Sequence, residues 1–259
     1  MGGALVKGWI SSRMIPSSLI TAVDVDAAKL KQTASKLKIK ASLKPEESLK
    51  KAGLIILAVK PQQMKGLLST LGPKFPAKAL VVSIAAGIST SQIEKGLPQG
   101  NPVVRVMPNT PALLGVGMAA VAAGSRAKKP HVKTALELFS AVGRSIEVTE
   151  DQMDYVTAVS GSGPAYIFHM IEAMTEASVK GGLKPEVALE LVKQTVLGAA
   201  RMAIETGKSP EELRIQVTSP GGTTQAALTT LEQKGFKETI NAAIESAAKR
   251  SAELRRSLE

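Results

Sequence analysis

The sequence predicts an α/β protein in which a doubly wound parallel sheet is followed by an all-helical part. Two observations lead to this prediction. Up to about residue 150, short apolar runs alternate with helical patterns, and several runs are unbroken, as in strands buried on both faces. From residue 151 onward, apolar residues recur only at helical spacing. We therefore expect two domains, residues 1–150 and residues 151–259.

Strands and helices are expected to alternate through the first domain. The unbroken apolar run Leu54–Val59 is typical of a strand buried on both faces. Pro61 is tolerated in a first helical turn, and Ser89 with Gln92 has the spacing of a capping box. The expected strands are residues 19–23, 54–59, 80–85, 103–107, 118–122 and 145–148. The expected helices are residues 26–37, 61–71, 89–97 and 133–142, after a first helix into which the glycine segment at the start of the chain runs directly.

The second domain is expected to consist of helices alone. Residues 163–180 carry apolar side chains at helical spacing, and a final amphipathic helix runs from about residue 240. Ser209 has Pro and Glu at the positions that favour a helix start. The helix expected over 185–206 is apolar nearly all round, so it must be buried, and we expect a partner subunit to cover it.

The composition excludes several classes of protein. A chain of 259 residues with 44% hydrophobic and 21% charged residues is globular, and disorder is excluded. Because cysteine is absent, disulfides, thiolate catalysis and thiolate zinc sites are excluded, and a reducing compartment fits. The chain has two histidines, so we expect no metal centre.

The charge balance favours anionic partners. The net charge of +11 suits phosphorylated cofactors, carboxylate substrates or nucleic acid. Nucleic acid is disfavoured because basic residues are interspersed with acidic ones and aromatic content is 3%. No membrane contact is expected, since the longest clean apolar run is far shorter than the roughly 20 residues of a spanning helix. No signal peptide is recognisable at the start, and we expect a soluble, cytoplasmic protein.

Three segments follow expected strands at the edge where doubly wound sheets bind ligands. They are Ala58-Val59-Lys60-Pro61, Ser83 to Gly87, and Met107 to Pro111. Their small residues would let a flat ring or a pyrophosphate approach the backbone. Ordinary strand-ending turns are the alternative interpretation.

The start of the chain carries part of a dinucleotide-binding fingerprint. Gly2-Gly3 reads as the last glycine of Gly-x-Gly-x-x-Gly, which is otherwise absent. A Rossmann-like fold without its first strand is therefore expected: either the chain begins at an internal methionine or the protein lacks this strand, with weak cofactor binding. Asp24 closes a strand 22 residues after Gly2, where an acid accepts hydrogen bonds from a ribose. A helix N-cap is the alternative role for Asp24.

Two glycine-rich segments precede helices of the second domain. Ser160-Gly161-Ser162 is not a nucleophile elbow, because that motif needs glycine two places before the serine. We interpret it as a glycine-lined helix start that lets another group pack closely, with a plain turn as the alternative. Thr218 to Gln225 (TSPGGTTQ) precedes a helix over 223–234, and its paired glycines leave N–H groups uncovered. It predicts a cradle for a small carboxylate; a plain Ser/Thr cap is the alternative.

Together these motifs resemble those of pyrroline-5-carboxylate reductases, in the same order and spacing over essentially the whole chain. The resemblance implies a Rossmann domain and a helical domain that interlocks into a homodimer, often in a ring of dimers. The implied reaction is hydride transfer from NAD(P)H to the C=N carbon of 1-pyrroline-5-carboxylate, which gives L-proline in the last step of proline synthesis.

The resemblance also assigns residues. Ser219 and the backbone N–H groups from Gly221 to Thr224, those of Gly222 and Thr223 included, would hold the substrate carboxylate. Thr224 would hydrogen-bond the ring nitrogen, as proton donor, as orienting group or as a relay through water. Glu150 falls at an acidic position near the substrate. The cofactor would lie along Gly2, Asp24, Ala58, Val59, Lys60, Pro61, Ala85, Ala86, Gly87 and Gln216.

Three of the cofactor positions differ in what they imply. Gln216 stands where relatives often carry Asn. A carboxylate at Asp24 repels a 2′-phosphate, so we expect NADH to be used at least as well as NADPH. Lys60 would attract phosphate or substrate, or is a solvated surface lysine.

Two other functions stay open from the residues. A hydroxyacid dehydrogenase would need a lysine on the helix that begins at Gly163, which offers only Lys180 near its far end. A truncated paralogue acting as a dimeric scaffold or ligand sensor would fold and dimerise without oxidising NAD(P)H.

Overall fold

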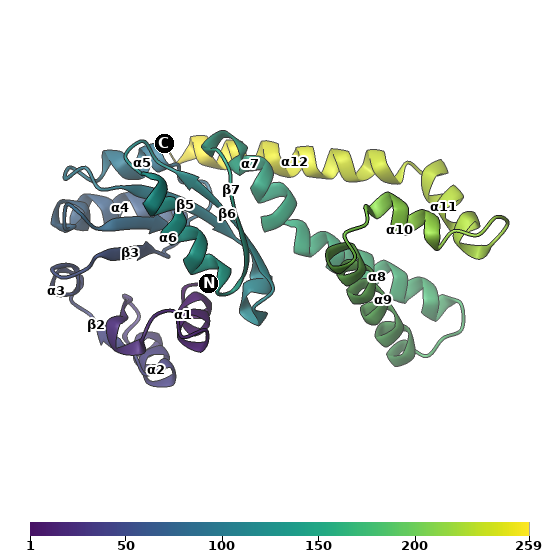
Figure 1. Ribbon diagram of the computed structural model, residues 1–259, viewed down its shortest axis with the longest axis horizontal. Coiled ribbons are helices and arrows are strands. Elements are labelled where there is room, and N and C mark those ends of the chain that lie inside the picture. The colour runs from purple at the N-terminus through teal and green to yellow at the C-terminus, as the bar shows by residue number, and fades with distance from the viewer. Residues whose placement is uncertain (259) are drawn as a thin grey trace. The chain divides into compact units, whose positions relative to one another are not determined.

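The computed structural model describes residues 1–258 and divides into two compact units (Figure 1). The first comprises Met1–Ser162 together with the chain from Glu245 onward. The second comprises Gly163–Ile244. Strands occur only in the first unit among the described residues, as the sequence predicts.

The first unit contains a five-stranded sheet in the order β3-β4-β5-β6-β7. Its strands are β3 (Leu54–Leu57), β4 (Leu80–Ser83), β5 (Val103–Pro108), β6 (Gly117–Ala123) and β7 (Gly143–Glu147). All neighbours pair in parallel except β5 and β6, which are antiparallel. An entirely parallel sheet was therefore the wrong expectation at this one pair. The connection over residues 109–116 is too short for a crossover, which takes a dozen or more residues.

A second, two-stranded parallel sheet pairs β1 (Thr21–Val23) with β2 (Lys40–Ser42). β2 is not predicted from the sequence, because a short run of Lys, Ala and Ser has no apolar alternation. Among the described residues, β1 pairs only with β2 and β3 only with β4, so β3 is an edge strand. For this reason Leu54, Ile55 and Ile56 are half-buried, and the predicted burial on both faces is wrong for this strand.

Helices cover both faces of the five-stranded sheet, which makes it doubly wound. On one face, Leu5 and Trp9 of α1 pack with Phe139 of α6 and with the valines of β4 to β6. On the other face, Met64 of α4 and Ile93 of α5 form a second core. The helices of this unit are α1 (Gly2–Ser11), α2 (Ala27–Leu37), α3 (Pro45–Leu49), α4 (Pro61–Leu71), α5 (Thr90–Lys95), α6 (Lys129–Ser140) and α7 (Met153–Val156).

Side-chain caps fix where several helices begin. Asp26 accepts a hydrogen bond from the Lys29 N–H at 3.0 Å at the start of α2. Ser89 and Gln92 form the predicted capping box of α5, with the Gln92 N–H bonded to the Ser89 Oγ at 3.2 Å. Trp9 then ties α1 to α6, because its Nε1 donates to the Leu138 carbonyl at 2.8 Å.

The second unit is a set of helices; the expected ranges 163–180, 185–206 and 223–234 agree with it to within one residue, whereas the last helix begins at Phe236 and not near residue 240. The helices are α8 (Gly163–Lys180), α9 (Pro185–Glu205), α10 (Pro210–Gln216), α11 (Thr223–Gln233) and the start of α12 (Phe236–Ser257). Ser209 caps α10 and its N–H donates to Glu212 at 2.7 Å. No helix among the described residues is long and apolar enough to cross a membrane.

The last turns of α12 belong to the first unit. Ser251 and Arg255 both bind Asp154 of α7, at 2.8 and 3.1 Å. Leu258 packs against the core that contains Ile93. The chain therefore returns to its first unit after the helical unit is complete.

Candidate active site

Three predicted segments lie at one edge of the sheet. Because β3, β4 and β5 are parallel, the residues that follow them meet at the same carboxyl edge. Ala58, Lys60 and Ala86 are exposed there, while Ala85 and Gly87 are buried. The first two segments thus present two alanines and one lysine to solvent at the place where doubly wound sheets bind ligands.

The start of α1 lies at this same edge. A Cβ built at Gly2 would come within 3.3 Å of the Ala58 Cβ, a tight contact, so glycine at this position lets α1 begin close to β3 without displacing Ala58. Among the described residues the N–H groups of Gly2 and Gly3 have no acceptor, and they point out of the positive end of a ten-residue helix.

Gly87 shapes the turn after β4. It has a φ of 72°, a left-handed conformation that favours glycine. A Cβ there would lie 3.7 Å from the Arg255 backbone nitrogen, so the turn packs against the end of α12. The Ala85 N–H donates to the Ser83 Oγ at 3.3 Å, which closes the turn.

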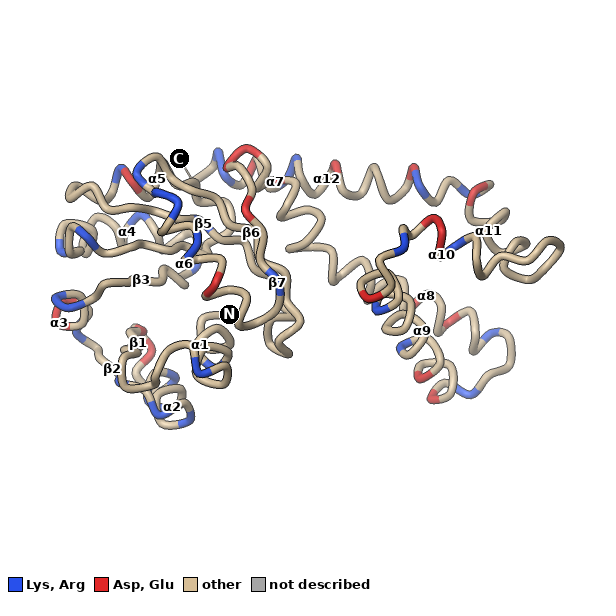
Figure 2. Tube along the Cα trace, in the orientation of Figure 1, with Lys and Arg blue, Asp and Glu red and all other residues tan. Residues whose placement is uncertain are grey.

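Asp24 follows β1 and is not the cap of α2; Asp26 is. One Asp24 oxygen accepts the Asp26 N–H at 3.2 Å, and the other accepts the Lys29 ammonium at 2.9 Å. The hydrogen bond from Lys29 holds the pKa of the Asp24 carboxyl below its ordinary value, and the pKa of Lys29 is raised in turn. Figure 2 shows the charged residues along this segment. The ion pair between Asp24 and Lys29 is not predicted by the sequence motifs.

Glu150 is held by a residue that the sequence reading missed. The Arg105 side chain is 1% exposed, and its Nη1 lies 2.7 Å from the Glu150 Oε1. The Arg105 Nη2 and the Glu150 Oε2 are buried and have no partner among the described residues. A signal was present, since Arg105 is the one charged residue in the otherwise apolar strand β5.

The predicted glycine-lined segment begins at Ser160 and Gly161 in a π-helical turn over Thr157–Gly161 and continues into the start of α8 at Gly163. Such turns are rare in proteins overall, but those that occur are often found at functional sites. Asn109 joins this turn to β5 and β6, because its Nδ2 donates to the Ser160 carbonyl at 3.1 Å and its Oδ1 accepts the Met118 N–H at 2.9 Å. A Cβ at Gly161 would come within 2.6 Å of the Met107 Cε, so glycine permits this close packing.

The loop before α11 is a tight turn built on both glycines. Gly221 has a φ of 73°, and a Cβ at Gly222 would collide with the Ser219 Oγ. The Gly221 N–H donates to the Gln225 Oε1 at 2.6 Å, and the Gly222 N–H donates to the Ser219 carbonyl at 3.0 Å. These two donors are thus used inside the loop.

The donors that remain lie in the first turn of α11. Among the described residues, the N–H groups of Thr223, Thr224 and Gln225 have no acceptor. They are the orphan donors of an eleven-residue helix, next to the hydroxyls of Ser219 and Thr224. Of the predicted N–H donors from Gly221 to Thr224, Gly221 and Gly222 are therefore used within the turn, Thr223 and Thr224 remain available, and Gln225 is added. The loop belongs to the helical unit, as does Gln216, whose Oε1 accepts from Lys208 at 3.3 Å.

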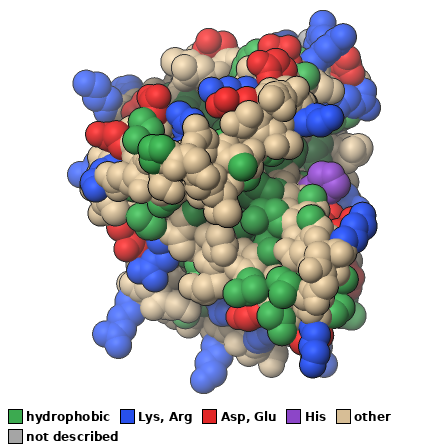
Figure 3. Space-filling view, turned by 90° about the vertical axis from the view of Figure 1, so that its right-hand side faces the viewer, with side chains coloured by type: hydrophobic (Ala, Val, Ile, Leu, Met, Phe, Trp, Pro, Cys, Tyr) green, Lys and Arg blue, Asp and Glu red, His purple; other side chains and the backbone are tan. Residues whose placement is uncertain are grey.

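The helical unit exposes much apolar surface. Leu191, Leu197 and Ile204 of α9 are 55%, 53% and 65% exposed, whereas Ala188 and Val192 are buried. Figure 3 shows hydrophobic side chains gathered near the centre of the visible face, with basic side chains toward its margins. Exposed apolar area of this extent marks a protein interface.

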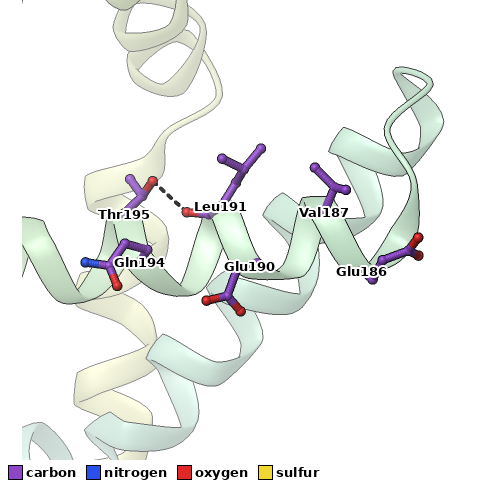
Figure 4. Close-up of a pocket in the computed structure, with 6 residues that line it drawn as sticks. All are labelled: Glu186, Val187, Glu190, Leu191, Gln194 and Thr195. Carbon is purple, nitrogen blue, oxygen red and sulfur yellow. Dashed lines mark hydrogen bonds between the residues drawn. The ribbon is translucent and has the colours of Figure 1, made fainter.

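A shallow hollow of about 530 Å³ lies on the same helix (Figure 4). Only α9 lines it, through Glu186, Val187, Glu190, Leu191, Gln194 and Thr195. Since none of the predicted site residues is among them, we assign this hollow to the uncovered helix face and not to the chemistry. No group of three or more potential metal ligands occurs in the part of the chain that is described.

Two family models match the chain. Residues 150–254 match the pyrroline-5-carboxylate reductase dimerisation family. Residues 1–87 match the family described as NADP oxidoreductase, coenzyme F420-dependent. The first match contains the π-helical turn and the loop before α11; the second contains α1 and the turns after β3 and β4.

The matched relatives extend over almost the whole chain. The pyrroline-5-carboxylate reductase of Methanosarcina acetivorans is 44% identical over 98% of this chain and 94% of its own length. That of Pseudomonas aeruginosa is 42% identical over 98% of this chain and 93% of its own length.

Solved structures agree with the sequence matches. A pyrroline-5-carboxylate reductase from Coxiella burnetii has a TM-score of 0.91 at 38% identity, covering 97% of this chain and 93% of its own. The Plasmodium falciparum pyrroline carboxylate reductase, solved with NADP bound, has a TM-score of 0.86 at 30% identity, covering 98% and 94%. On this sequence identity and coverage, the chain belongs to the pyrroline-5-carboxylate reductase family.

Proposed function

We propose that the chain reduces the C=N bond of 1-pyrroline-5-carboxylate to give L-proline, with NADH or NADPH as the reductant. The observation that carries this proposal is the 44% identity to a pyrroline-5-carboxylate reductase over 98% of the chain. The reaction needs an anchored carboxylate, a ring held flat against the nicotinamide, and a proton for the nitrogen.

The carboxyl edge of the sheet has features that fit a dinucleotide. The start of α1 offers two N–H groups without acceptors at the positive end of a helix, which suits a phosphate. The close approach of Gly2 to Ala58 leaves no side chain to block it. When bound, the nicotinamide supplies the hydride that the imine carbon accepts. We propose as cofactor residues Gly2, Asp24, Ala58, Val59, Lys60, Pro61, Ala85, Ala86, Gly87 and Gln216.

The loop before α11 is proposed to hold the substrate carboxylate. The Ser219 hydroxyl and the N–H groups of Thr223 and Thr224 are its donors, because they are not used inside the loop. Gly221 and Gly222 act by shaping the turn. The Thr224 hydroxyl is proposed to orient the ring nitrogen and to pass it a proton through water, since a threonine hydroxyl is a poor acid by itself.

Glu150 is retained in the proposed substrate site, with Arg105 as the residue that fixes its carboxylate. The support is the ion pair of 2.7 Å with a guanidinium that is almost fully buried. A carboxylate held in this way cannot swing away from its position, which is what a substrate-orienting group needs.

The functional division and assembly complete the proposal. We propose a cofactor-binding part over residues 1–150 and a substrate-binding and dimerisation part over 151–259. In support, the NADP oxidoreductase match lies within the first part, over residues 1–87, and the dimerisation match covers residues 150–254. A homodimer agrees with the dimerisation family. A ring of such dimers and a cytoplasmic location are further parts of the proposal, which native mass spectrometry and cell fractionation would test.

The direct test is steady-state reduction of 1-pyrroline-5-carboxylate, followed by loss of NAD(P)H absorbance and identification of L-proline. Thr224→Val removes the hydroxyl and keeps the shape, and it should lower kcat about 100-fold. Thr229→Val on the same helix is the matched control and should leave kcat unchanged. A folded dimer that binds NADPH and yields no proline would refute the proposed function.

A further inference from the structure

The ion pair at the end of β1 has a bearing on which cofactor the chain accepts. Asp24 and Lys29 are 33% and 66% exposed, and their charged atoms lie 2.9 Å apart. Asp24 follows a parallel strand at its carboxyl end, and Lys29 lies in the first turn of the helix that comes next. An acid at this place accepts the hydroxyls of an adenosine ribose and repels a 2′-phosphate.

Lys29 changes that electrostatic balance. Its ammonium occupies one carboxylate oxygen, while the Asp26 N–H occupies the other. The pair is close to neutral, so the repulsion that a lone carboxylate would exert on a phosphate is largely removed. The ammonium has three donors and uses one on Asp24, which leaves two for another anion.

The surroundings are also basic. Residues 1–78 hold 14 of the 33 Lys and Arg residues and only 4 of the 22 Asp and Glu residues. Figure 2 shows these blue positions along α2, α3 and α4. Nearly all of the net positive charge of the chain thus belongs to the part that contains the Asp24–Lys29 pair, and it attracts a ligand that carries an extra phosphate.

We propose that Lys29 is a specificity-determining residue that lets the chain accept NADPH as well as NADH, by neutralising Asp24 and donating to the 2′-phosphate. This inference rests on the proposed function, because it assumes that the cofactor ribose lies at the end of β1. Asp24 serves the ribose hydroxyls of NADH, and Lys29 serves the additional phosphate of NADPH. The expected preference for NADH, drawn from Asp24 alone, is thereby offset.

The test compares ligands that differ only in the 2′-phosphate. Calorimetric titration would give the affinities for 2′,5′-ADP and 5′-AMP, and nucleotide fluorescence those for NADPH and NADH, all without substrate. Lys29→Ala should weaken 2′,5′-ADP and NADPH about tenfold, the size of one charge-assisted hydrogen bond. It should leave 5′-AMP and NADH within about twofold, because they lack the phosphate.

Lys31→Ala is the matched control. It removes the same charge from an exposed position of the same helix. Lys31 is two residues after Lys29, so its side chain lies about 200° around the helix from that of Lys29. It should therefore change the affinities for all four ligands by less than about twofold. Lys29→Arg should keep the NADPH affinity, whereas Asp24→Ala should weaken NADH and tighten NADPH.

The outcomes separate this inference from the function on which it rests. Equal losses for Lys29→Ala and Lys31→Ala, or a loss shared by NADH and NADPH, would overturn the role of Lys29 and leave the reductase function standing. A wild-type chain that binds none of the four nucleotides would overturn both. Circular dichroism of each variant is the check that the exposed substitution leaves the fold intact.

Discussion

The ion pair between Arg105 and Glu150 gives the sharpest prediction of stability. Glu150→Ala removes the only partner among residues 1–258 of a guanidinium that is 1% exposed. Leaving a buried charge unpaired costs about 3–5 kcal/mol. Because 30% of the Glu150 side chain is exposed, water relieves part of this cost, and we expect a loss of about 2–3 kcal/mol.

That loss is measurable by thermal or urea unfolding. For a chain of this size, 1 kcal/mol corresponds to about 2–4 °C in Tm, so Glu150→Ala should lower Tm by about 5–10 °C. Protomer concentration must be the same for all variants, because dimerisation adds to the apparent stability.

The matched variants are Arg105→Met and the double substitution Arg105→Met with Glu150→Ala. Replacing both members of a buried pair is tolerated better than removing one, because no charge is left without a partner. The double variant should therefore be more stable than Glu150→Ala, with a coupling energy of at least about 1.5 kcal/mol. Additive effects within about 0.5 kcal/mol would show that the pair does not hold Glu150 as described.

Three further predictions follow from the loop, the exposed helix and the acidic pair. Gly222→Ala should raise the KM for pyrroline-5-carboxylate at least about tenfold, because the added methyl group collides with Ser219. Gly198→Ala is the control, because a methyl group there meets open space. Equal KM values for the two variants would count against the carboxylate cradle. Leu191→Asp should raise the dimer dissociation constant, measured by light scattering, at least about 100-fold, because a symmetric interface buries the new charge twice. An unchanged dissociation constant would exclude this face of α9 from the dimer interface. The pKa of Asp24 is lowered by Lys29, so the stability from this pair is present above the ordinary pKa of 3.8 and is lost as the pH falls through the lower value of the folded state. Acidification from about pH 5 to pH 3 should lower the urea midpoint of wild type more than that of Lys29→Ala, and parallel curves would argue against the pair.

The strongly periodic segments could be predicted from sequence almost to the residue. The helix over 163–180 and the capping boxes at Ser89 and Ser209 are confirmed, because they depend on local spacing and side-chain hydrogen bonds. The doubly wound arrangement is confirmed as well. Strand direction was harder: the antiparallel pair β5–β6 depends on the short connection, which periodicity does not register.

The site was only partly accessible to sequence reasoning. Motifs placed the turns after β3, β4 and β5 at one edge, because parallel strands end together. They could not reveal that Arg105 reaches Glu150 across 45 positions, or that Gln225 takes the Gly221 N–H. Such partnerships arise from tertiary packing, so they leave no fixed spacing in the chain; whether the assigned residues bind cofactor and substrate stays a prediction.

The bond pattern around Asp154 has a consequence for how the polypeptide can be divided. Ser251 and Arg255 donate hydrogen bonds to the Asp154 carboxylate of the first unit. That unit is therefore discontinuous in sequence, and the helical unit is inserted between its two pieces. A fragment that stops at residue 162 would expose the hydrophobic core residues that Leu258 covers. It would also leave Asp154 without its hydrogen bonds to Ser251 and Arg255. A nick inside 163–244, by contrast, would leave the severed tail docked by its own contacts, so protease cleavage and dissociation should be separate events.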